Sequence, residues 1–222
     1  MLAWKIGPAL AAGCSVVVKP ATETSLTALR VAELASDAGL PRGVLNIVPG
    51  SGAEAGEPIG RHMDIDMVSF TGSTATGKRF LAYSAESNAK EVVLEMGGKN
   101  PAVVLQDAEN LDRVAQHIVN GAFWNMGENC SAASRLIVHK DIKDALLSRI
   151  DTHARHWNIG DPLDPETRLG ALVSKAHFKK VSGFLKLADR FRLGGGAKEG
   201  FVEATIIELE NNNHQLAKEE IF

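Results

Sequence analysis

The sequence predicts an α/β fold built on parallel sheet, arranged in two successive domains. Short β-branched and apolar runs alternate with helical patterns along the first hundred residues, and strands this apolar are typical of parallel sheets covered by helices on both faces. The glycine pair at 97–98 interrupts the alternation, which then restarts. We therefore expect a first domain over residues 1–97 and a second over residues 98–222.

Strands and helices of the first domain follow from the apolar pattern. We expect strands over 15–19, 44–48, 67–70 and 91–94, and helices over 26–38, 53–61 and 74–83. Gly39 closes the first of these helices, and the Pro49-Gly50 turn ends the second strand. This strand and helix order is the layout of a parallel open-sheet, Rossmann-like domain.

The second domain shows the same alternation less regularly. We expect strands over 102–105 and 135–139, a helix over about 111–124, a β-prone stretch over 201–207, and a helix whose one face carries Ile142, Leu146, Leu147 and Ile150. Residues 161–165 contain two prolines and form a loop. The chain ends on an apolar pair after no completed unit, so we expect both domains to be incomplete.

Composition excludes several classes of function. The net charge is −3 with acids and bases interspersed, so no basic field exists for nucleic acid or an anionic membrane. No stretch reaches the roughly 20 apolar residues of a membrane span. The two cysteines, Cys14 and Cys130, lie in unlike contexts, which favours a reducing compartment and a cytoplasmic location. The seven histidines show no metal-ligand spacing, so we expect no metal site.

Two segments between a strand and a helix are candidates for binding an anion. Residues 70–77 run FTGSTATG, where free backbone N–H groups and the helix N-terminus could hold a phosphate, or where a serine could simply cap the helix. Residues 49–56 form a near miss to the dinucleotide fingerprint, which we interpret as a tight turn. Lys19 ends the first strand, at the edge of the sheet where such folds bind ligands.

A carboxylate and a thiol, each set among glycines, could supply a base and a nucleophile. Residues 94–101 run LEMGGKNP and place Glu95 at the end of an apolar strand, where desolvation would raise a carboxyl pKa. Residues 123–130 run FWNMGENC and place Cys130 after a glycine-containing turn. Taken alone, a strand-end glutamate is often solvated, and a lone cysteine is often a small buried hydrophobe.

These segments together resemble the active-site signatures of the aldehyde dehydrogenase family, and the resemblance covers essentially the whole chain. It implies that the Cys130 thiol attacks an aldehyde and that Glu95 activates the water that hydrolyses the resulting thioester. It also implies a dinucleotide pyrophosphate site at Gly72, Ser73 and Gly77. The resemblance assigns the adenosine ribose to Lys19, and the nicotinamide ribose to Glu220 within the terminal KEEIF.

Three departures from the family pattern bear on function. Relatives that prefer NAD usually carry a glutamate where this chain has Thr22. A carboxylate would repel a 2′-phosphate, whereas a threonine hydroxyl could donate a hydrogen bond to one, so we expect NAD or NADP as cofactor, although Thr22 could instead cap the next helix. Glu128 stands where glutamine is frequent and, if ionised and turned inward, would raise the pKa of the thiol. The resemblance implies that the asparagine completing the family's oxyanion hole would lie upstream of Met1.

The resemblance therefore implies an NAD(P)-dependent oxidoreductase that converts an aldehyde to a carboxylic acid, with hydrolysis favoured over transfer to coenzyme A by Glu95. Residues 83–99 are similar to the γ-glutamyl-γ-aminobutyraldehyde dehydrogenase subgroup. Full-length family members are expected to be homo-oligomers. The alternative is a truncated, non-catalytic fragment or pairing subunit that retains partial nucleotide affinity. We expect the isolated chain, as an internal fragment, to be marginally folded or prone to aggregation.

Overall fold

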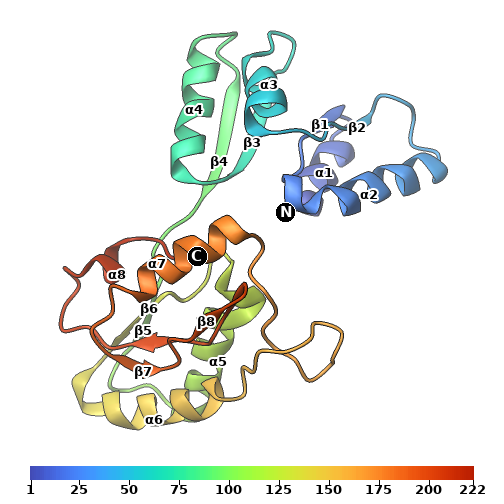
Figure 1. Ribbon diagram of the computed structural model, residues 1–222. Coiled ribbons are helices and arrows are strands. Elements are labelled where there is room, and N and C mark those ends of the chain that lie inside the picture. The colour runs from blue at the N-terminus through green and yellow to red at the C-terminus, as the bar shows by residue number, and fades with distance from the viewer. The chain divides into compact units, whose positions relative to one another are not determined.

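The chain folds into two compact units, Met1–Met96 and Gly97–Phe222. The structure is a computed structural model that describes all residues from 1 to 222. The first unit runs from blue to green in Figure 1 and the second from green to red. Both units combine helices with parallel strand pairs, as the sequence predicts. Each unit is described by itself.

In the first unit, an initial helix is followed by three successive pairs of a strand and a helix, and then by a last strand. Its helices are α1 (Leu2–Ala11), α2 (Ser25–Asp37), α3 (Glu57–Arg61) and α4 (Thr74–Ala85), and its strands are β1 (Val16–Val18), β2 (Leu45–Ile47), β3 (Met67–Gly72) and β4 (Glu91–Met96). Short turns η1 (Thr22–Thr24) and η2 (Gly52–Gly56) precede α2 and α3. Helix α1 is absent from the sequence prediction because Gly7 and Pro8 in its middle obscure the helical pattern.

The strands of the first unit pair in parallel, in two separate two-stranded sheets. Strand β1 pairs with β2 through Val16 and Leu45, and β3 pairs with β4 over six residues from Met67 and Glu91 onward. The continuous sheet that the apolar pattern suggested is not formed within this unit. Parallel pairing nevertheless brings the carboxyl ends of β3 and β4 to the same edge.

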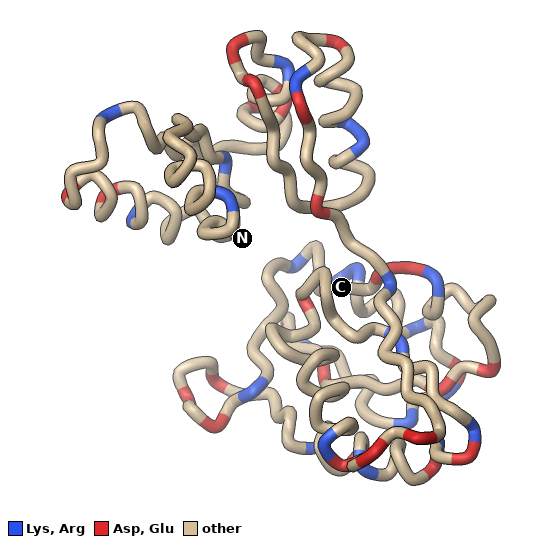
Figure 2. Tube along the Cα trace, turned by 180° about the vertical axis from the view of Figure 1, so that it is seen from behind, with Lys and Arg blue, Asp and Glu red and all other residues tan.

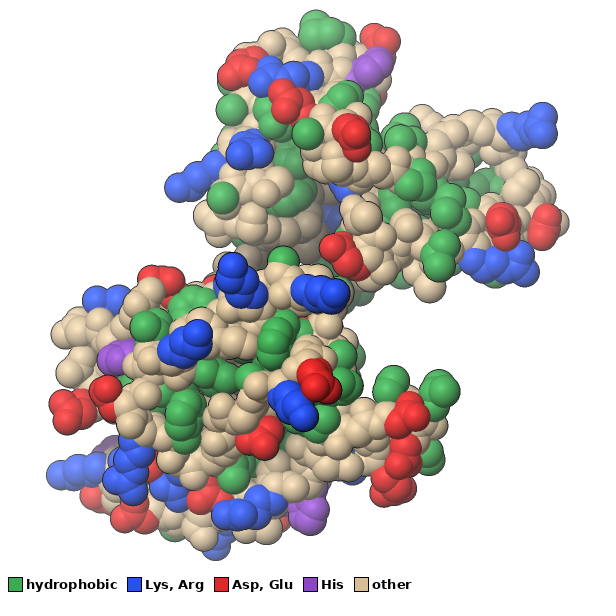
Figure 3. Space-filling view, in the orientation of Figure 1, with side chains coloured by type: hydrophobic (Ala, Val, Ile, Leu, Met, Phe, Trp, Pro, Cys, Tyr) green, Lys and Arg blue, Asp and Glu red, His purple; other side chains and the backbone are tan.

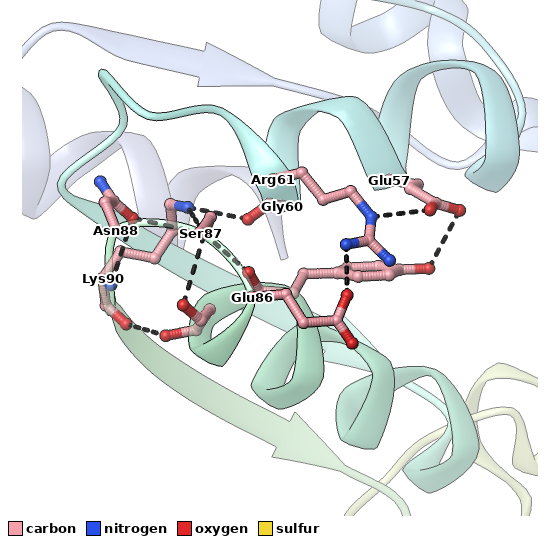
Figure 4. Close-up of polar contacts among 9 residues, drawn as sticks. Glu57, Gly60, Arg61, Glu86, Ser87, Asn88 and Lys90 are labelled. Carbon is pink, nitrogen blue, oxygen red and sulfur yellow. Dashed lines mark hydrogen bonds and ion pairs between the residues drawn. The ribbon is translucent and has the colours of Figure 1, made fainter.

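Helices α3 and α4 are joined by polar contacts that Figure 4 shows in detail. The Arg61 guanidinium lies 4.4 Å from the centre of the Tyr83 ring and pairs with Glu57 and Glu86. Lys90 is the one buried charged residue, and its Nζ donates to the Gly60 carbonyl oxygen and to Ser87 Oγ, both at 2.8 Å. These bonds fasten the end of α3 to the turn between α4 and β4.

The second unit contains helices α5 (Leu111–Phe123), α6 (Lys143–Ala154), α7 (Lys175–Leu185) and α8 (Gln215–Lys218). Its strands are β5 (Pro101–Val104), β6 (Arg135–Val138), β7 (Phe191–Leu193), β8 (Ala197–Lys198), β9 (Phe201–Val202) and β10 (Ile206–Ile207), with short turns η3 (Trp124–Gly127) and η4 (Lys140–Ile142). Strands β5 and β6 pair in parallel, whereas β10 with β7 and β8 with β9 are antiparallel. The sequence prediction missed α7 because lysines interrupt its apolar face, and it missed β7 because a charged Arg192 stands between its two apolar residues.

The core of the second unit lies between α5 and α6. Fully buried Leu146 and Ala115 meet there, joined by Val119 and Ile150 at 1% and 3% exposure. The pair of helices is also bridged by His153 Nε2, which lies 2.9 Å from Asp112 Oδ1. His153 therefore links α6 to α5 through its side chain.

The surface of both units mixes charges and apolar side chains. Acidic and basic residues are both scattered over the chain trace in Figure 2, although the charged residues between 168 and 186 are all basic. Hydrophobic side chains are visible on both units in Figure 3, and several are more than half exposed, among them Trp4, Leu26, Val103, Leu105 and Leu163. None of the helices has both the length and the apolar character that a membrane crossing requires.

Candidate functional site

The turn between β3 and α4 presents a helix N-terminus at the carboxyl end of a parallel strand. Ser73 is the N-cap of α4, and its Oγ accepts from the Thr76 N–H at 3.3 Å. The capping role considered from sequence is therefore present. Gly77 is buried in the first turns of α4, and a Cβ there would come 2.6 Å from Met96 Sδ. Gly77 thus permits α4 to pack closely on β4, while Gly72 and Ser73 stay exposed at the turn.

Strand register places Glu95 beside this turn. In the β3 and β4 pair, Thr71 is the partner of Glu95 and Gly72 is the partner of Met96. The Thr71 Oγ1 atom is buried and has no hydrogen-bond partner. Since both strands end at the same edge, the carboxylate of Glu95 and the N-terminus of α4 belong to one region of the first unit.

Glu95 itself is exposed, which corrects the burial expected from sequence. Strand β4 alternates so that Val92, Leu94 and Met96 are partly buried, while Glu95 lies on the opposite face. Apolar neighbours in the sequence therefore did not imply an apolar environment. A nearby cation is present instead: Lys5 Nζ on α1 donates to Ser69 Oγ at 2.9 Å. Burial lowers the pKa of Lys5, and the negative charge of Glu95 opposes this by raising it.

Lys19 lies across the loop that follows β2. Its Nζ donates to the Pro20 carbonyl oxygen at 2.7 Å and to the Gly50 carbonyl oxygen at 3.3 Å. A Cβ on Gly56 would come 3.6 Å from Lys19 Cδ, so the glycine-rich loop packs directly on the lysine stem. Gly50 has a φ of 157°, which supports the interpretation of this loop as a turn. Lys19 and the loop lie together at a second edge of the unit, formed by the carboxyl ends of β1 and β2.

Thr22 begins the short turn η1 and is exposed. The N-cap of α2 is Thr24, and neither α2 nor η1 receives a side-chain cap hydrogen bond. The alternative that Thr22 caps the following helix is therefore wrong. Its hydroxyl remains available to a ligand at the same edge as Lys19.

Cys130 follows an unusual backbone turn in the second unit. After α5, Asn125, Met126 and Gly127 have φ values of 53°, 57° and 75° in succession. Left-handed backbone is rare for a side chain such as methionine and costs free energy. The turn ends at Cys130, which is half-buried, with its Sγ 3.8 Å from Asn129 Oδ1. The thiol is therefore presented from irregular backbone rather than from a helix or strand.

Glu128 is fixed by contacts with the segment around α7. Its Oε1 accepts from the Val173 N–H at 3.0 Å and lies 3.4 Å from His177 Nε2. The side chains of Glu128 and His177 are only 7% and 12% exposed. The same His177 nitrogen lies 2.6 Å from the Phe222 carbonyl oxygen. The Glu128 carboxylate is thus held by a backbone N–H and by a histidine. Both partners come from a distant segment, so the local sequence does not reveal them.

Glu220 packs onto the glycine pair at the start of the second unit. Its Oε1 accepts from the Gly98 N–H at 3.1 Å, and a Cβ on Gly97 would overlap the carboxylate. Burial, and then the positive charge of Arg135, lowers the pKa of Lys99, while Glu220 raises it. Glycine at 97 is therefore needed for close approach of Glu220.

Cys130 and Glu220 line one cavity of about 650 Å³ within the second unit. Gly98, Lys99 and Asn100 also reach this cavity, whose remaining lining is largely apolar. A second hollow of about 570 Å³ lies against Asn129 and Ser131, the two neighbours of Cys130, and is lined elsewhere by side chains that include Trp124 and His117. The structure thus brings together the predicted residues Cys130 and Glu220 in the second unit. The other predicted residues, Glu95, Lys19, Thr22, Gly72, Ser73 and Gly77, all lie in the first.

Comparison with known protein families identifies the family to which the chain belongs. The model of the "Aldehyde dehydrogenase family" matches residues 1–222. The chain belongs to the aldehyde dehydrogenase family. Its α/β fold and the family predicted from the two signature segments are both confirmed.

Individual aldehyde dehydrogenases resemble the chain along its whole length. It is 68% identical over 227 residues to an aminoacetaldehyde dehydrogenase of Pseudomonas aeruginosa, covering 100% of this chain and 46% of that protein. A γ-glutamyl-γ-aminobutyraldehyde dehydrogenase structure from Burkholderia cenocepacia is 46% identical with a TM-score of 0.95, and covers 100% of this chain and 46% of its own. An indole-3-acetaldehyde dehydrogenase solved in complex with NAD+ is 42% identical with a TM-score of 0.96, at the same coverage. The chain spans about half the length of the relatives it matches.

Sequence reasoning missed several members of this candidate aldehyde dehydrogenase site. Lys5 lies near Glu95, Gly50 holds Lys19, and Asn100 donates to the Cys130 carbonyl oxygen at 2.6 Å. Asn100 sits inside the quoted segment 94–101, but nothing in its spacing indicated the contact. No group of three or more His, Cys, Asp or Glu side chains in the chain could hold a metal ion.

Proposed function

We propose that the chain carries the dinucleotide-binding and thiol-bearing parts of an NAD(P)-dependent enzyme that oxidises an aldehyde to a carboxylic acid. The first unit would bind the dinucleotide and the second would supply the nucleophile. The single observation that carries the proposal is the match of the aldehyde dehydrogenase family to all 222 residues. The roles proposed for Cys130 and Glu95 rest on the resemblance of residues 94–101 and 123–130 to the family's signature segments. The similar proteins named as dehydrogenases of aldehydes support oxidation of an aldehyde as the class of reaction.

The first unit offers groups that fit a dinucleotide. The N-terminus of α4, a helix of 12 residues, follows a parallel strand directly, and such ends favour phosphate. The buried Thr71 Oγ1 beside it has no partner and could donate to a phosphate oxygen. Lys19 and Thr22 lie at the second edge, where Lys19 would contact a ribose. The exposed Thr22 hydroxyl, in place of a carboxylate, supports use of NADP as well as NAD.

The chain's own residues would perform two chemical steps. The Cys130 sulfur would form a bond to the aldehyde carbonyl carbon, giving a thiohemiacetal whose oxygen is stabilised by the Cys130 backbone N–H. The dinucleotide, when bound, supplies the acceptor for the hydride of that carbon; loss of the hydride re-forms the carbonyl bond and leaves a thioester on Cys130. Glu95 would then accept a proton from a water molecule that attacks the thioester, which releases the acid and restores the thiol. Exposure of Glu95 leaves it open to water.

Three versions of the purified chain test this proposal. Each is mixed with an aldehyde and NAD, or with NADP, and reduced dinucleotide is measured. Aminoacetaldehyde is the first aldehyde to try, because a relative that is 68% identical is named for it. Cys130→Ala is expected to abolish formation of reduced dinucleotide, whereas the control Cys14→Ala retains it, since Cys14 is exposed and lies outside both signature segments of the sequence.

Glu95→Gln separates the two steps. Loss of a general base is expected to slow turnover by about 10²–10⁴-fold, while bond formation by Cys130 continues. Mass spectrometry should then find the acyl group of the aldehyde attached to Cys130 in Glu95→Gln. Equal turnover in Glu95→Gln and the unaltered chain would contradict the role of Glu95.

The second candidate function is nucleotide binding without catalysis. It is favoured by the complete β3 to α4 turn with its unpartnered Thr71 hydroxyl. Saturable binding of NAD or NADP without any aldehyde-dependent reduction would establish it. Aldehyde-dependent reduction that requires Cys130 would exclude it.

A further inference from the structure

The turn that presents Cys130 needs support from outside itself. Its three successive left-handed residues, Asn125 to Gly127, include two that are not glycine, and such backbone persists only where surrounding contacts hold it. Within the turn, the Glu128 N–H bonds the Asn125 carbonyl oxygen at 2.9 Å, and Asn125 Nδ2 bonds the Glu128 carbonyl oxygen at 3.0 Å. Contacts of this kind move with the turn and do not fix its position.

Asn100 supplies a contact from the sheet to the nucleophile itself. Its Nδ2 donates to the Cys130 carbonyl oxygen at 2.6 Å and to the Ala132 carbonyl oxygen at 3.2 Å. One amide group therefore holds two carbonyls, one at the cysteine and one two residues later. The two hydrogens of an asparagine amide are sufficient for both bonds.

The backbone of Asn100 is itself held firmly. Its carbonyl oxygen accepts from the Arg135 N–H at 3.0 Å, and the next residue, Pro101, is the first of β5 and pairs with Arg135 of β6. The Arg135 side chain also donates to the Lys99 carbonyl oxygen, at 2.7 Å from Nη2. Asn100 thus projects from paired strands rather than from a loose loop, so it can act as a fixed reference for the turn.

We propose that Asn100 is a positioning residue for the Cys130 nucleophile. By holding the carbonyls of Cys130 and Ala132, it stops the peptide groups on the C-terminal side of the thiol from rotating. The thiol then keeps one orientation toward a bound aldehyde, which lowers the entropic cost of reaction. The inference rests on the proposed function only for the role of Cys130. It also gives a physical link between the two signature segments, because Asn100 belongs to one and Cys130 to the other.

The chemistry of the amide distinguishes positioning from filling space. Asn100→Asp keeps the shape but places carboxylate oxygens against two carbonyl oxygens, which removes both donors and adds repulsion. Asn100→Ser keeps one donor on a shorter side chain. If the hydrogen bonds donated by Asn100 hold the turn, Asn100→Asp should loosen the Cys130 turn at least as much as Asn100→Ala. Asn100→Ser should loosen it less than either.

The chain provides a matched control in the other unit. Asn88 Nδ2 also donates to two carbonyl oxygens, those of Met63 at 2.8 Å and Ile65 at 3.0 Å. Asn88→Ala therefore removes the same two amide-to-carbonyl bonds, together with the bonds that Asn88 Oδ1 accepts from the Lys90 N–H at 3.3 Å and from Ser87 Oγ at 3.5 Å, so it is at least as disruptive locally and lies outside the Cys130 turn. All variants are made with Cys14→Ser, so that Cys130 is the one thiol in the chain.

Two measurements on the full chain test the proposal without aldehyde or dinucleotide. In hydrogen exchange, the amides of Ala132, Ala133 and Ser134, each bonded to a carbonyl, are expected to exchange about tenfold faster in Asn100→Ala and unchanged in Asn88→Ala. The released, half-buried thiol is also expected to react at least about threefold faster with iodoacetamide, because less opening is needed to expose it. Rates are compared where circular dichroism shows each variant folded.

The outcomes are decisive in either direction. Unchanged exchange and alkylation in folded Asn100→Ala, or equal effects of Asn88→Ala, would overturn the proposal. If Asn100→Ala does not fold, Asn100→Ser is used instead. It must raise the rates of amide exchange and of Cys130 alkylation above those of the unaltered chain, by less than the factors expected for alanine, and unchanged rates in Asn100→Ser would contradict the role of Asn100. Failure of the chain to oxidise aldehydes would refute the proposed function while leaving these results intact. In an active chain, Asn100→Ala should lower kcat more than it changes KM, since it disorders the nucleophile and not the binding surfaces.

Discussion

Single residues show most clearly where local sequence predicts chemistry and where it does not. Gly97 leaves no room for a Cβ beside Glu220, a contact that joins residues 123 positions apart and that the local sequence does not indicate. The environment of Glu95 was predicted wrongly, because strand alternation placed it on the exposed face of β4. Sequence supplies the identity and order of such residues. The partner that arrives from a distant segment, as Asn100 does at Cys130, is set by the fold.

The Glu128 carboxylate makes a testable case at this scale. Removing its partner by His177→Leu would leave a nearly buried carboxylate with one backbone donor, Val173 N–H. We expect a loss of about 1–3 kcal/mol in the free energy of unfolding. Glu128→Gln should cost less, because a neutral amide oxygen still accepts from Val173. Urea denaturation measures both.

His156→Leu is the control for that comparison, since His156 is an exposed histidine two residues beyond the end of α6. It removes an imidazole without leaving a buried charge. Equal losses for His156→Leu and His177→Leu would mean that the Glu128 contact contributes nothing beyond the substitution itself.

At the scale of elements, the spacing of apolar residues predicted a helix correctly only where its apolar face was long and uninterrupted. Helix α5 begins at Leu111 as predicted, because Asn110 caps it and its apolar stripe is strong. Helix α7 was missed, since Lys179 and Lys180 divide its apolar residues. The strands of the first unit were found to within two residues at each end. Their division into separate pairs depends on which strands meet, which no local pattern encodes.

An ion-pair network joins elements of the second unit and makes stability there depend on pH. Arg192 of β7 contacts Asp151 of α6 at 2.8 Å and Glu208, just after β10, at 2.7 Å, and Lys143 contacts Glu208 at 3.0 Å. The hydrogen bond from Arg192, followed by that from Lys143, lowers the pKa of Glu208 below its ordinary 4.5. A depressed folded-state pKa stabilises the fold above pH 4.5, and this contribution is lost as pH falls through the lowered value.

Glu208→Gln should therefore lower the free energy of unfolding above pH 4.5 and have a shrinking effect below it. The side chains of Arg192 and Glu208 are 27% and 44% exposed, so the loss is expected to stay below about 1 kcal/mol. Unfolding by urea on both sides of pH 4.5 measures it. Glu199→Gln is the control, because Glu199 is 78% exposed and its contact with Lys198 is 3.6 Å long. A loss that is the same at both pH values would contradict the network.

At the scale of the whole molecule, the balance of charge and apolar surface governs solubility. The net charge of −3 gives little repulsion between copies. Strands β5 and β6 form a two-stranded parallel sheet, which leaves hydrogen-bonding groups on the outer edges. Val103 on β5 and Leu105 just after it are 58% and 63% exposed. We therefore expect the isolated chain to self-associate through this apolar edge as concentration rises.

A charged substitution at the edge should weaken that association. Leu105→Lys is expected to lower the association constant roughly tenfold or more, because burying a leucine contributes about 1.5–3 kcal/mol and a lysine on an edge strand opposes pairing. Leu163→Lys is the matched control: Leu163 is 90% exposed but lies in the loop before α7, away from any strand. Sedimentation velocity over a range of concentrations would report both. A chain that stays monomeric throughout, or equal effects of the two lysines, would show that the β5 edge does not drive association, and that exposed apolar area alone does not determine how this molecule behaves in solution.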